Sequence, residues 1–157
     1  MRHIISVIVD NKPGELVRIA GLFSRRGFNI DSLAVGETEN SAFSRITLVV
    51  TGDDQVIEQI SKQLYKLIDT YKVVDLTPLN HIDREMLLVK VSVTPTTRSE
   101  VIEIANVFRA KIIDVGDKSL VTEITGDSDK IEGFISLLRR FGIMEMVRTG
   151  TVGIARG

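Results

Sequence analysis

Apolar side chains recur along this chain with two periods, which predict an alternation of short strands and helices. Residues 3–9 form a run rich in β-branched side chains, and the turn-forming residues 10–14 follow. After the turn, the spacing changes to three and four residues, which predicts an amphipathic helix that ends at residues 25–27. The apolar stripe of this helix consists of Leu16, Ile19, Ala20 and Phe23.

The next segment predicts two strands, a second helix and a closing strand. Residues 29–35 and 45–50 read as strands that are joined by a polar hairpin loop. A helix is expected to begin after Thr51-Gly52-Asp53, and residues 71–76 predict a further strand. The order of elements is therefore β-α-β-β-α-β. The apolar face predicted for the second helix consists of Ile57, Ile60, Leu64, Leu67 and Ile68.

The same order of elements returns from about residue 80. Thr51-Gly52-Asp53 recurs as Thr125-Gly126-Asp127, and each triplet precedes a predicted helix. We expect an α+β fold of two tandem ferredoxin-like domains, at residues 1–78 and 79–157, each an antiparallel sheet with helices on one face. Such sheets leave one face and their edge strands uncovered, which favours dimerisation or docking onto a partner. The strands predicted in the second copy are residues 87–93, 111–115, 120–125 and 144–154.

Composition removes several classes of function. The chain of 157 residues has 20 basic and 21 acidic side chains, a net charge of -1 that offers no basic face for nucleic acid. Its lack of cysteine excludes disulfides, thiolate catalysis and cysteine metal sites. No signal-peptide pattern and no apolar run of membrane-spanning length occur, so we expect a soluble, cytoplasmic protein that does not bind membranes.

Candidate chemistry is sparse, and we expect neither catalytic residues nor a metal site. No phosphate loop, nucleophile elbow or dinucleotide fingerprint is present. His3 and His81 lie at equivalent strand starts, where exposed or capping histidines are a better interpretation than metal ligands or general bases. Asp53 and Asp127 precede helices, which favours helix capping over paired acid-base catalysis.

The turn at residues 10–16 carries the most informative pattern. Gly14 would let the backbone approach a ligand closely, and the first N–H groups of the following helix would attract a carboxylate or phosphate. Asn11 offers both a donor and an acceptor, as a zwitterionic amino acid would require. An ordinary helix-start turn capped by Asn11 explains the same residues. The second copy has Thr94-Pro95-Thr96 at this place and lacks the Pro-Gly pair.

Three stretches taken together resemble a known family. They are DNKPGEL at residues 10–16, GLFSRRGFNIDSL at residues 21–33 and SRITLVV at residues 44–50. They are similar to the ACT domain of the small, regulatory subunits of acetolactate synthase, also called acetohydroxyacid synthase. Residues 83–91, residues 112–115 and the ending RTGxxGxxRG resemble the second domain of that family, so the resemblance covers essentially the whole chain.

The resemblance implies a regulatory subunit without its own active site. Such a subunit has no cofactor of its own; thiamine diphosphate, Mg²⁺ and FAD are expected on the catalytic, large subunit. The small subunit activates that partner and confers feedback inhibition by branched-chain amino acids, usually valine, with leucine and isoleucine as the alternatives. The ACT domain, residues 1–78, would then bind the effector and form a homodimer, while residues 79–157 would support docking to the catalytic subunit.

The resemblance also implies an effector site between two protomers. Asn11, Pro13, Gly14, Glu15 and Leu16 would hold the amino acid at the turn. Asn29 and Ile30 would come from the partner protomer, and Leu16 and Ile30 would also form the apolar wall. Two alternatives stay open: an enzyme in its own right, and an RNA-binding module, although the strand at residues 45–50 has no aromatic residue on which bases could stack.

Overall fold

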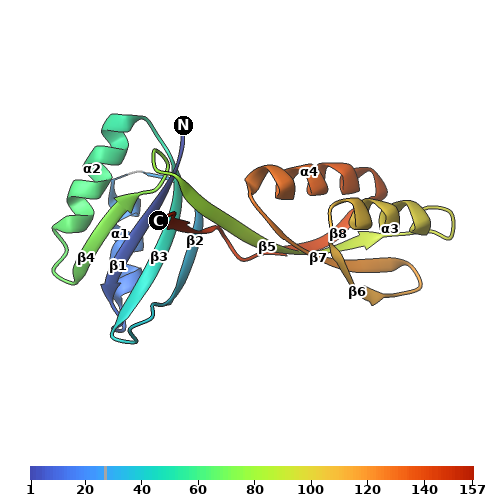
Figure 1. The fold of residues 1–157 in the computed structure, drawn as a ribbon, viewed down its shortest axis with the longest axis horizontal. Coiled ribbons are helices and arrows are strands. Elements are labelled where there is room, and N and C mark those ends of the chain that lie inside the picture. The colour runs from blue at the N-terminus through green and yellow to red at the C-terminus, as the bar shows by residue number, and fades with distance from the viewer. Residues whose placement is uncertain (27) are drawn as a thin grey trace. The chain divides into compact units, whose positions relative to one another are not determined.

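The computed structural model describes residues 1–26 and 28–157. Gly27, one of the residues predicted to end the first helix, lies outside the described residues. The chain forms two compact units (Figure 1). Unit 1 holds Met1–Ile82 and Thr151–Gly157, and unit 2 holds Asp83–Gly150. Each unit is built on one antiparallel sheet.

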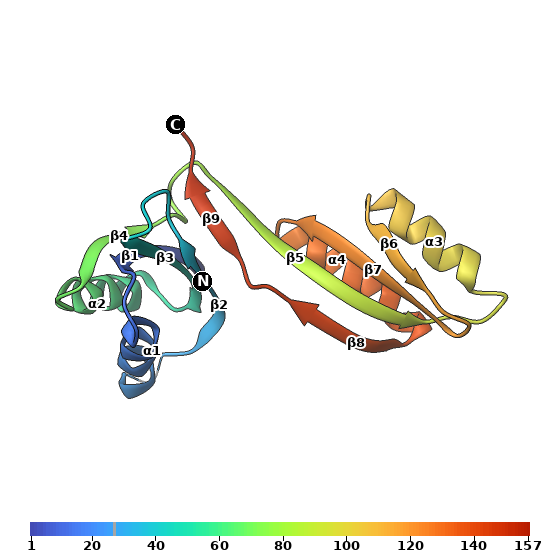
Figure 2. The ribbon, with the colours of Figure 1, turned by 90° about the horizontal axis from the view of Figure 1, so that it is seen from below.

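Unit 1 follows the predicted order, with four strands arranged β2-β3-β1-β4. Its helices lie on one face of this sheet, as Figure 2 shows. Between the helices and the sheet, Ile5, Phe23 and Leu48 are buried in the core. Ile68, predicted on the apolar face of the second helix, is 93% exposed because that helix ends at Tyr65. The elements are β1 (Arg2–Asp10), α1 (Glu15–Arg25), β2 (Ile30–Glu37), β3 (Phe43–Thr51), α2 (Asp54–Tyr65) and β4 (Thr70–Asp75).

Unit 2 repeats this order, and its strands are arranged β6-β7-β5-β8. Leu87, Leu120 and Phe134 are fully buried in its core. The predicted α+β class with two antiparallel sheets is confirmed. The elements are β5 (His81–Ser92), whose first two residues belong to unit 1, α3 (Arg98–Val107), β6 (Lys111–Val115), β7 (Ser119–Gly126), α4 (Ser128–Leu138), the short 3-10 helix η1 (Arg139–Phe141) and β8 (Ile143–Arg148).

The two aspartates that precede helices cap them, as the sequence predicted. Asp53 Oδ1 accepts a hydrogen bond of 2.9 Å from the backbone N–H of Val56. Asp127 Oδ1 accepts one of 3.0 Å from the N–H of Lys130. These bonds satisfy N–H groups that a helix start leaves without partners, and the carboxylates match the helix dipole.

The C-terminal segment differs from its prediction as a single strand over residues 144–154. It forms β8 and then β9 (Val152–Ala155), because the backbone turns at Gly150, where φ is +85°. The left-handed conformation of Gly150 cannot belong to a continuous strand. β9 pairs with β5, and the N–H of Arg156 donates to the Asn80 carbonyl oxygen over 2.8 Å.

Residues 151–157 consequently belong to unit 1, although they follow unit 2 in the chain. The compact units therefore differ from the predicted domains of residues 1–78 and 79–157 at both ends of the second one. A Cβ on Gly153 would lie 3.0 Å from Leu76 Cδ1 and 3.6 Å from Ile4 Cγ2. The backbone of β9 thus packs directly on a small apolar cluster of Ile4, Val49 and Leu76.

Candidate functional site

The turn between β1 and α1 is held open by one glycine. Gly14 has φ of +89°, a conformation that favours glycine, and it is the N-terminal boundary residue of α1. A Cβ at this position would meet no atom within 4 Å, so the backbone conformation rather than crowding explains the glycine. No side chain of the described residues caps this helix end. Its first-turn N–H groups can therefore serve an anionic ligand.

The Asn11 side chain does not cap α1, whereas the alternative interpretation of the turn predicted that it would. Its Nδ2 donates to Glu37 Oε1 over 3.2 Å and to the Ser41 carbonyl oxygen over 3.0 Å. Its Oδ1 accepts a bond of 3.0 Å from the Ser44 hydroxyl. Asn11 therefore ties the turn to the β2–β3 hairpin. That it also contacts an effector stays a prediction.

Glu15 is the first residue of α1 and is buried, with 5% of its surface exposed. Its Oε1 lies 3.5 Å from Arg18 Nη1, whereas its Oε2 is buried without a hydrogen-bond partner. Burial raises the pKa of Glu15, and the neighbouring Asp69 carboxylate raises it further. A carboxyl that is more easily protonated repels an anion at the helix start less strongly.

Asp69, in the loop between α2 and β4, joins this turn through ion pairs that the sequence did not reveal. Its carboxylate lies 3.1 Å from Arg18 Nη1 and 3.6 Å from Lys12 Nζ. The neighbouring Glu15 carboxyl lowers the pKa of Asp69, and the Asp10 carboxylate, 3.2 Å from Lys12 Nζ, raises the pKa of Lys12. Asp10 likewise raises the pKa of Tyr71. No local pattern marks Asp69, because folding alone brings it to the turn.

Pro13 and Leu16 complete the predicted turn, and both are exposed. Asn29 and Ile30 lie elsewhere. Ile30 pairs with Val50, which pairs with His3 near the start of β1, whereas the turn follows the end of β1. Seven strand residues at about 3.4 Å each separate the two groups by about 24 Å within one chain. One chain therefore does not bring the seven predicted residues together.

The histidines differ from one another. His3 is buried, with 3% exposed, and its Nδ1 lies 3.0 Å from Asp75 Oδ2, so the expectation of an exposed or capping histidine is wrong for this residue. The His3 side chain is buried because it lies on the side of β1 that faces the interior. His81 Nδ1 lies 2.9 Å from the Leu79 carbonyl oxygen. Within residues 1–26 and 28–157, no group of three or more His, Asp or Glu side chains is arranged to hold a metal ion.

Two family models match this chain. Residues 5–72 match the acetohydroxyacid synthase (AHAS) small subunit-like ACT domain, and residues 84–157 match the small subunit of acetolactate synthase. The chain belongs to the acetolactate synthase small-subunit family. The predicted resemblance is thereby confirmed over both halves of the chain.

Individual relatives agree with this family over their full length. A probable acetolactate synthase small subunit of Archaeoglobus fulgidus is 53% identical, with 100% of this chain and 98% of the relative covered. The acetolactate synthase small subunit of Mycobacterium leprae is 50% identical, over 99% of this chain and 92% of the relative. The crystal structure of the small subunit from Thermotoga maritima is 45% identical and superposes with a TM-score of 0.91, covering 100% and 98% of the two chains.

Membership of the small-subunit family settles two predictions. The chain is a subunit of acetolactate synthase rather than a catalyst by itself, and a small subunit implies a catalytic partner. The ACT-type domain gives it a regulatory role. Separately, none of the helices within residues 1–26 and 28–157 is long and apolar enough to cross a membrane.

Proposed function

We propose that this small subunit activates the catalytic subunit of acetolactate synthase and makes it subject to feedback inhibition by a branched-chain amino acid, with valine as the preferred effector. The catalytic subunit would hold thiamine diphosphate, Mg²⁺ and FAD, and the complex would act in the cytoplasm. The small subunit would supply only binding and conformational coupling. A ligand achieves this by binding two states of the complex with different affinities, and a coupling of ~1 to 3 kcal/mol gives roughly 5- to 150-fold effects.

The uncapped start of α1 at Gly14 is the observation that carries the proposal. A carboxylate there can accept hydrogen bonds from first-turn N–H groups, and the open space above Gly14 admits the ligand's backbone. The exposed side chain of Leu16 next to this end offers apolar surface to an aliphatic side chain. Valine has both a carboxylate and an aliphatic side chain.

The distance of about 24 Å between the turn and Ile30 supports a site shared by two protomers. If unit 1 pairs with a second copy about a two-fold axis, the start of β2 of one copy can lie beside the turn of the other. β2 is an edge strand of its sheet, so its outer side is available for such pairing. Asn29 and Ile30 of the partner would then complete the site.

Calorimetric titration of the isolated protein with L-valine, L-leucine and L-isoleucine tests the proposal. We expect saturable binding of valine. Gly14→Asp should abolish it, because the introduced carboxylate accepts the same N–H groups and repels the ligand's own carboxylate. Gly14→Asn is the matched control: it has a similar shape and tolerates the left-handed backbone, but carries no charge.

Valine binding that survives in Gly14→Asn at a reduced level and is lost in Gly14→Asp would support an anion site at the turn. Equal loss in both variants would point to steric exclusion rather than charge. If none of the three amino acids binds, either to the isolated protein or to its complex with the catalytic subunit, the effector site is wrong.

A further inference from the structure

One oxygen of the Glu15 carboxyl is buried at the start of α1 and has no hydrogen-bond partner in the described part of the chain. Glu15 is the first residue of the helix, and 5% of its surface is exposed. Its Oε1 lies 3.5 Å from Arg18 Nη1, and its Oε2 is the oxygen without a partner. An ionised carboxylate is costly to bury unless its oxygens are paired, whereas a protonated one needs an acceptor for its O–H. The burial of Oε2 therefore favours the neutral form of Glu15.

Asp69 is the acceptor that a protonated Glu15 would use. The Asp69 carboxylate lies 3.1 Å from Arg18 Nη1, the same nitrogen that lies near Glu15 Oε1. Two neighbouring carboxyl groups repel one another when both are ionised, so one proton between them is favoured. Burial raises the pKa of Glu15, while the neighbouring Glu15 carboxyl lowers the pKa of Asp69. The shared proton therefore resides on Glu15 rather than on Asp69.

The charges around this pair do not balance when every carboxyl is ionised. Three acidic side chains then lie beside two cations, because Lys12 Nζ is 3.2 Å from Asp10 and 3.6 Å from Asp69, and Arg18 serves the other contacts. Asp10 raises the pKa of the Tyr71 phenol, which therefore stays neutral. A proton on Glu15 restores the balance. The titratable side chains of this group, from β1, the turn, α1, the α2–β4 loop and β4, are Asp10, Lys12, Glu15, Arg18, Asp69 and Tyr71.

An effector carboxylate at the start of α1 would add a further negative charge beside Glu15. Ionised Glu15 would repel this carboxylate and would compete with it for the positive end of the helix dipole. Protonated Glu15 does neither. The bound state therefore favours the neutral form of Glu15 more strongly than the free state does. By thermodynamic linkage, binding of the effector and protonation of Glu15 then assist each other.

We propose that Glu15 takes up a proton when the effector's carboxylate binds at the start of α1, so that the small subunit binds its effector more tightly as the pH falls. The proton comes from the solvent, is held on the Glu15 carboxyl and is directed at the Asp69 carboxylate. This inference rests on the proposed function, because it takes an amino acid to bind at the turn. The effector itself stays zwitterionic near neutral pH, so the protein supplies the group that titrates.

Proton uptake by the full-length parent protein can be measured directly. L-valine is titrated by calorimetry at about pH 6.5 in PIPES and in imidazole, two buffers that differ strongly in their enthalpy of ionisation. The difference between the two binding enthalpies gives the number of protons that accompany each valine. We expect uptake of a fraction of one proton. The affinity for valine should fall at least 3-fold between about pH 5.5 and about pH 7.5, because one linked proton changes it by at most about 10-fold per pH unit.

Two variants assign the proton. Glu15→Gln is neutral at every pH, so it should bind valine without proton uptake and with an affinity that does not change with pH. Asp69→Asn takes away the neighbouring negative charge, lowers the pKa of Glu15 and should reduce the uptake at the same pH. Glu58→Gln makes the same chemical change at an exposed position of α2 and should behave like the parent.

The possible failures are distinct. If the parent binds valine without proton uptake and with the same affinity at both ends of the pH range, the linkage is wrong and the proposed function stands. Proton uptake that persists in Glu15→Gln would also overturn the linkage, since another group would then titrate. If the parent does not bind valine at any of these pH values, alone or with the catalytic subunit, the proposed function itself fails.

Discussion

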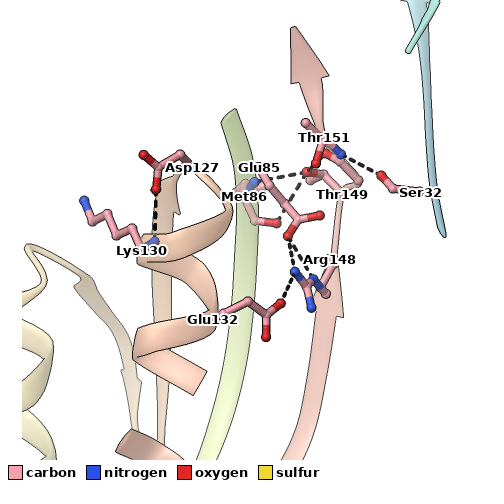
Figure 3. A network of polar contacts seen from close by, with 10 residues as sticks. Ser32, Glu85, Met86, Asp127, Lys130, Glu132, Arg148, Thr149 and Thr151 are labelled. Carbon is pink, nitrogen blue, oxygen red and sulfur yellow. Dashed lines mark hydrogen bonds and ion pairs between the residues drawn. The ribbon is translucent and has the colours of Figure 1, made fainter. Parts of the chain in front are cut away.

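The Ser32 hydroxyl accepts a hydrogen bond from the N–H of Thr151, a residue 119 positions further along the chain (Figure 3). This bond attaches residues 151–157 to unit 1. The N-terminal sheet therefore has part of its second face covered by its own chain. A sheet with helices on one face must otherwise bury its other face against a partner. The last seven residues are thus a structural part of the ACT-type unit.

A substitution at Gly153 tests whether β9 packs on unit 1. We expect Gly153→Val to lower the free energy of unfolding of unit 1 by about 1 to 3 kcal/mol, because its Cβ would lie only 3.0 Å from Leu76 Cδ1. Native-state hydrogen exchange of the Leu76 amide, which donates to the Ile4 carbonyl, measures the loss. Gly157→Val has open space and should leave that exchange unchanged. Unaltered protection in Gly153→Val would mean that β9 does not pack as described.

The Glu85–Arg148 pair should contribute to the stability of unit 2. The Glu85 side chain is 8% exposed, so Arg148→Met leaves a buried carboxylate without its guanidinium. We expect a loss of about 2 to 3 kcal/mol, less than for a fully buried pair because the Arg148 side chain remains 36% exposed. Glu132→Gln removes only the outer, exposed partner and should cost less than about 1 kcal/mol. Hydrogen exchange of the backbone amides of unit 2 measures the loss of stability in each variant. Equal losses in Arg148→Met and Glu132→Gln would contradict this ranking.

The raised pKa of Glu15 predicts a dependence of stability on pH. The folded chain holds the Glu15 proton more tightly than the unfolded chain, so this group favours folding at low pH, and that contribution is lost as the pH rises through its folded pKa. The lowered pKa of Asp69 acts in the opposite direction, because its contribution is lost as the pH falls. Glu15→Gln removes the pH dependence that comes from Glu15 and leaves the one that comes from Asp69.

Urea unfolding at several values between about pH 4 and about pH 8 measures this effect. We expect the free energy of unfolding of the Glu15→Gln protein to decline less toward high pH than that of the parent. Glu58→Gln makes the same chemical change at an exposed position of α2 and should follow the parent curve. Parallel curves for Glu15→Gln and the parent would show that Glu15 is not the responsible group.

Ser44 tests whether the orientation of Asn11 matters for valine. Ser44→Ala removes the hydroxyl that donates to Asn11 Oδ1 without altering the turn itself. If Asn11 contacts the ligand, loss of this support should weaken L-valine binding by about 2- to 10-fold, the range of one hydrogen bond. Ser41→Ala is the control, because Ser41 supports Asn11 only through its backbone carbonyl. Calorimetric titration of both variants with L-valine measures the effect. An unchanged affinity of Ser44→Ala for valine would indicate that Asn11 does not need the hydrogen bond from Ser44.

Much of the fold followed from local patterns. The spacing of Ile57, Ile60 and Leu64 predicted the buried face of α2, and Asp53 predicted where that helix begins. The repeated Thr-Gly-Asp triplet revealed that unit 2 follows the same order of elements. Helix periodicity and capping depend on residues only a few positions apart, so they can be recognised before the chain is folded.

The candidate site could be predicted only in part. The Pro-Gly turn marked the start of α1, and the structure shows that no side chain caps this helix end. The left-handed conformation of Gly14 was not predicted. Asp69 and the hydrogen bonds of Asn11 to the β2–β3 hairpin were missed, because no local spacing connects them to the turn. The predicted contribution of Asn29 and Ile30 stays a prediction, since it depends on a second copy of the chain.

The sequence by itself determined the family, the order of the elements and the location of the candidate turn, because each of these depends on short, ordered motifs. Only the tertiary structure decided that β9 belongs to unit 1, that His3 is buried, and that Ser32 holds Thr151. These facts depend on side chains and backbone groups brought together from distant parts of the chain. The free energy of such long-range packing is shared among many residues, so no single stretch of sequence reports it.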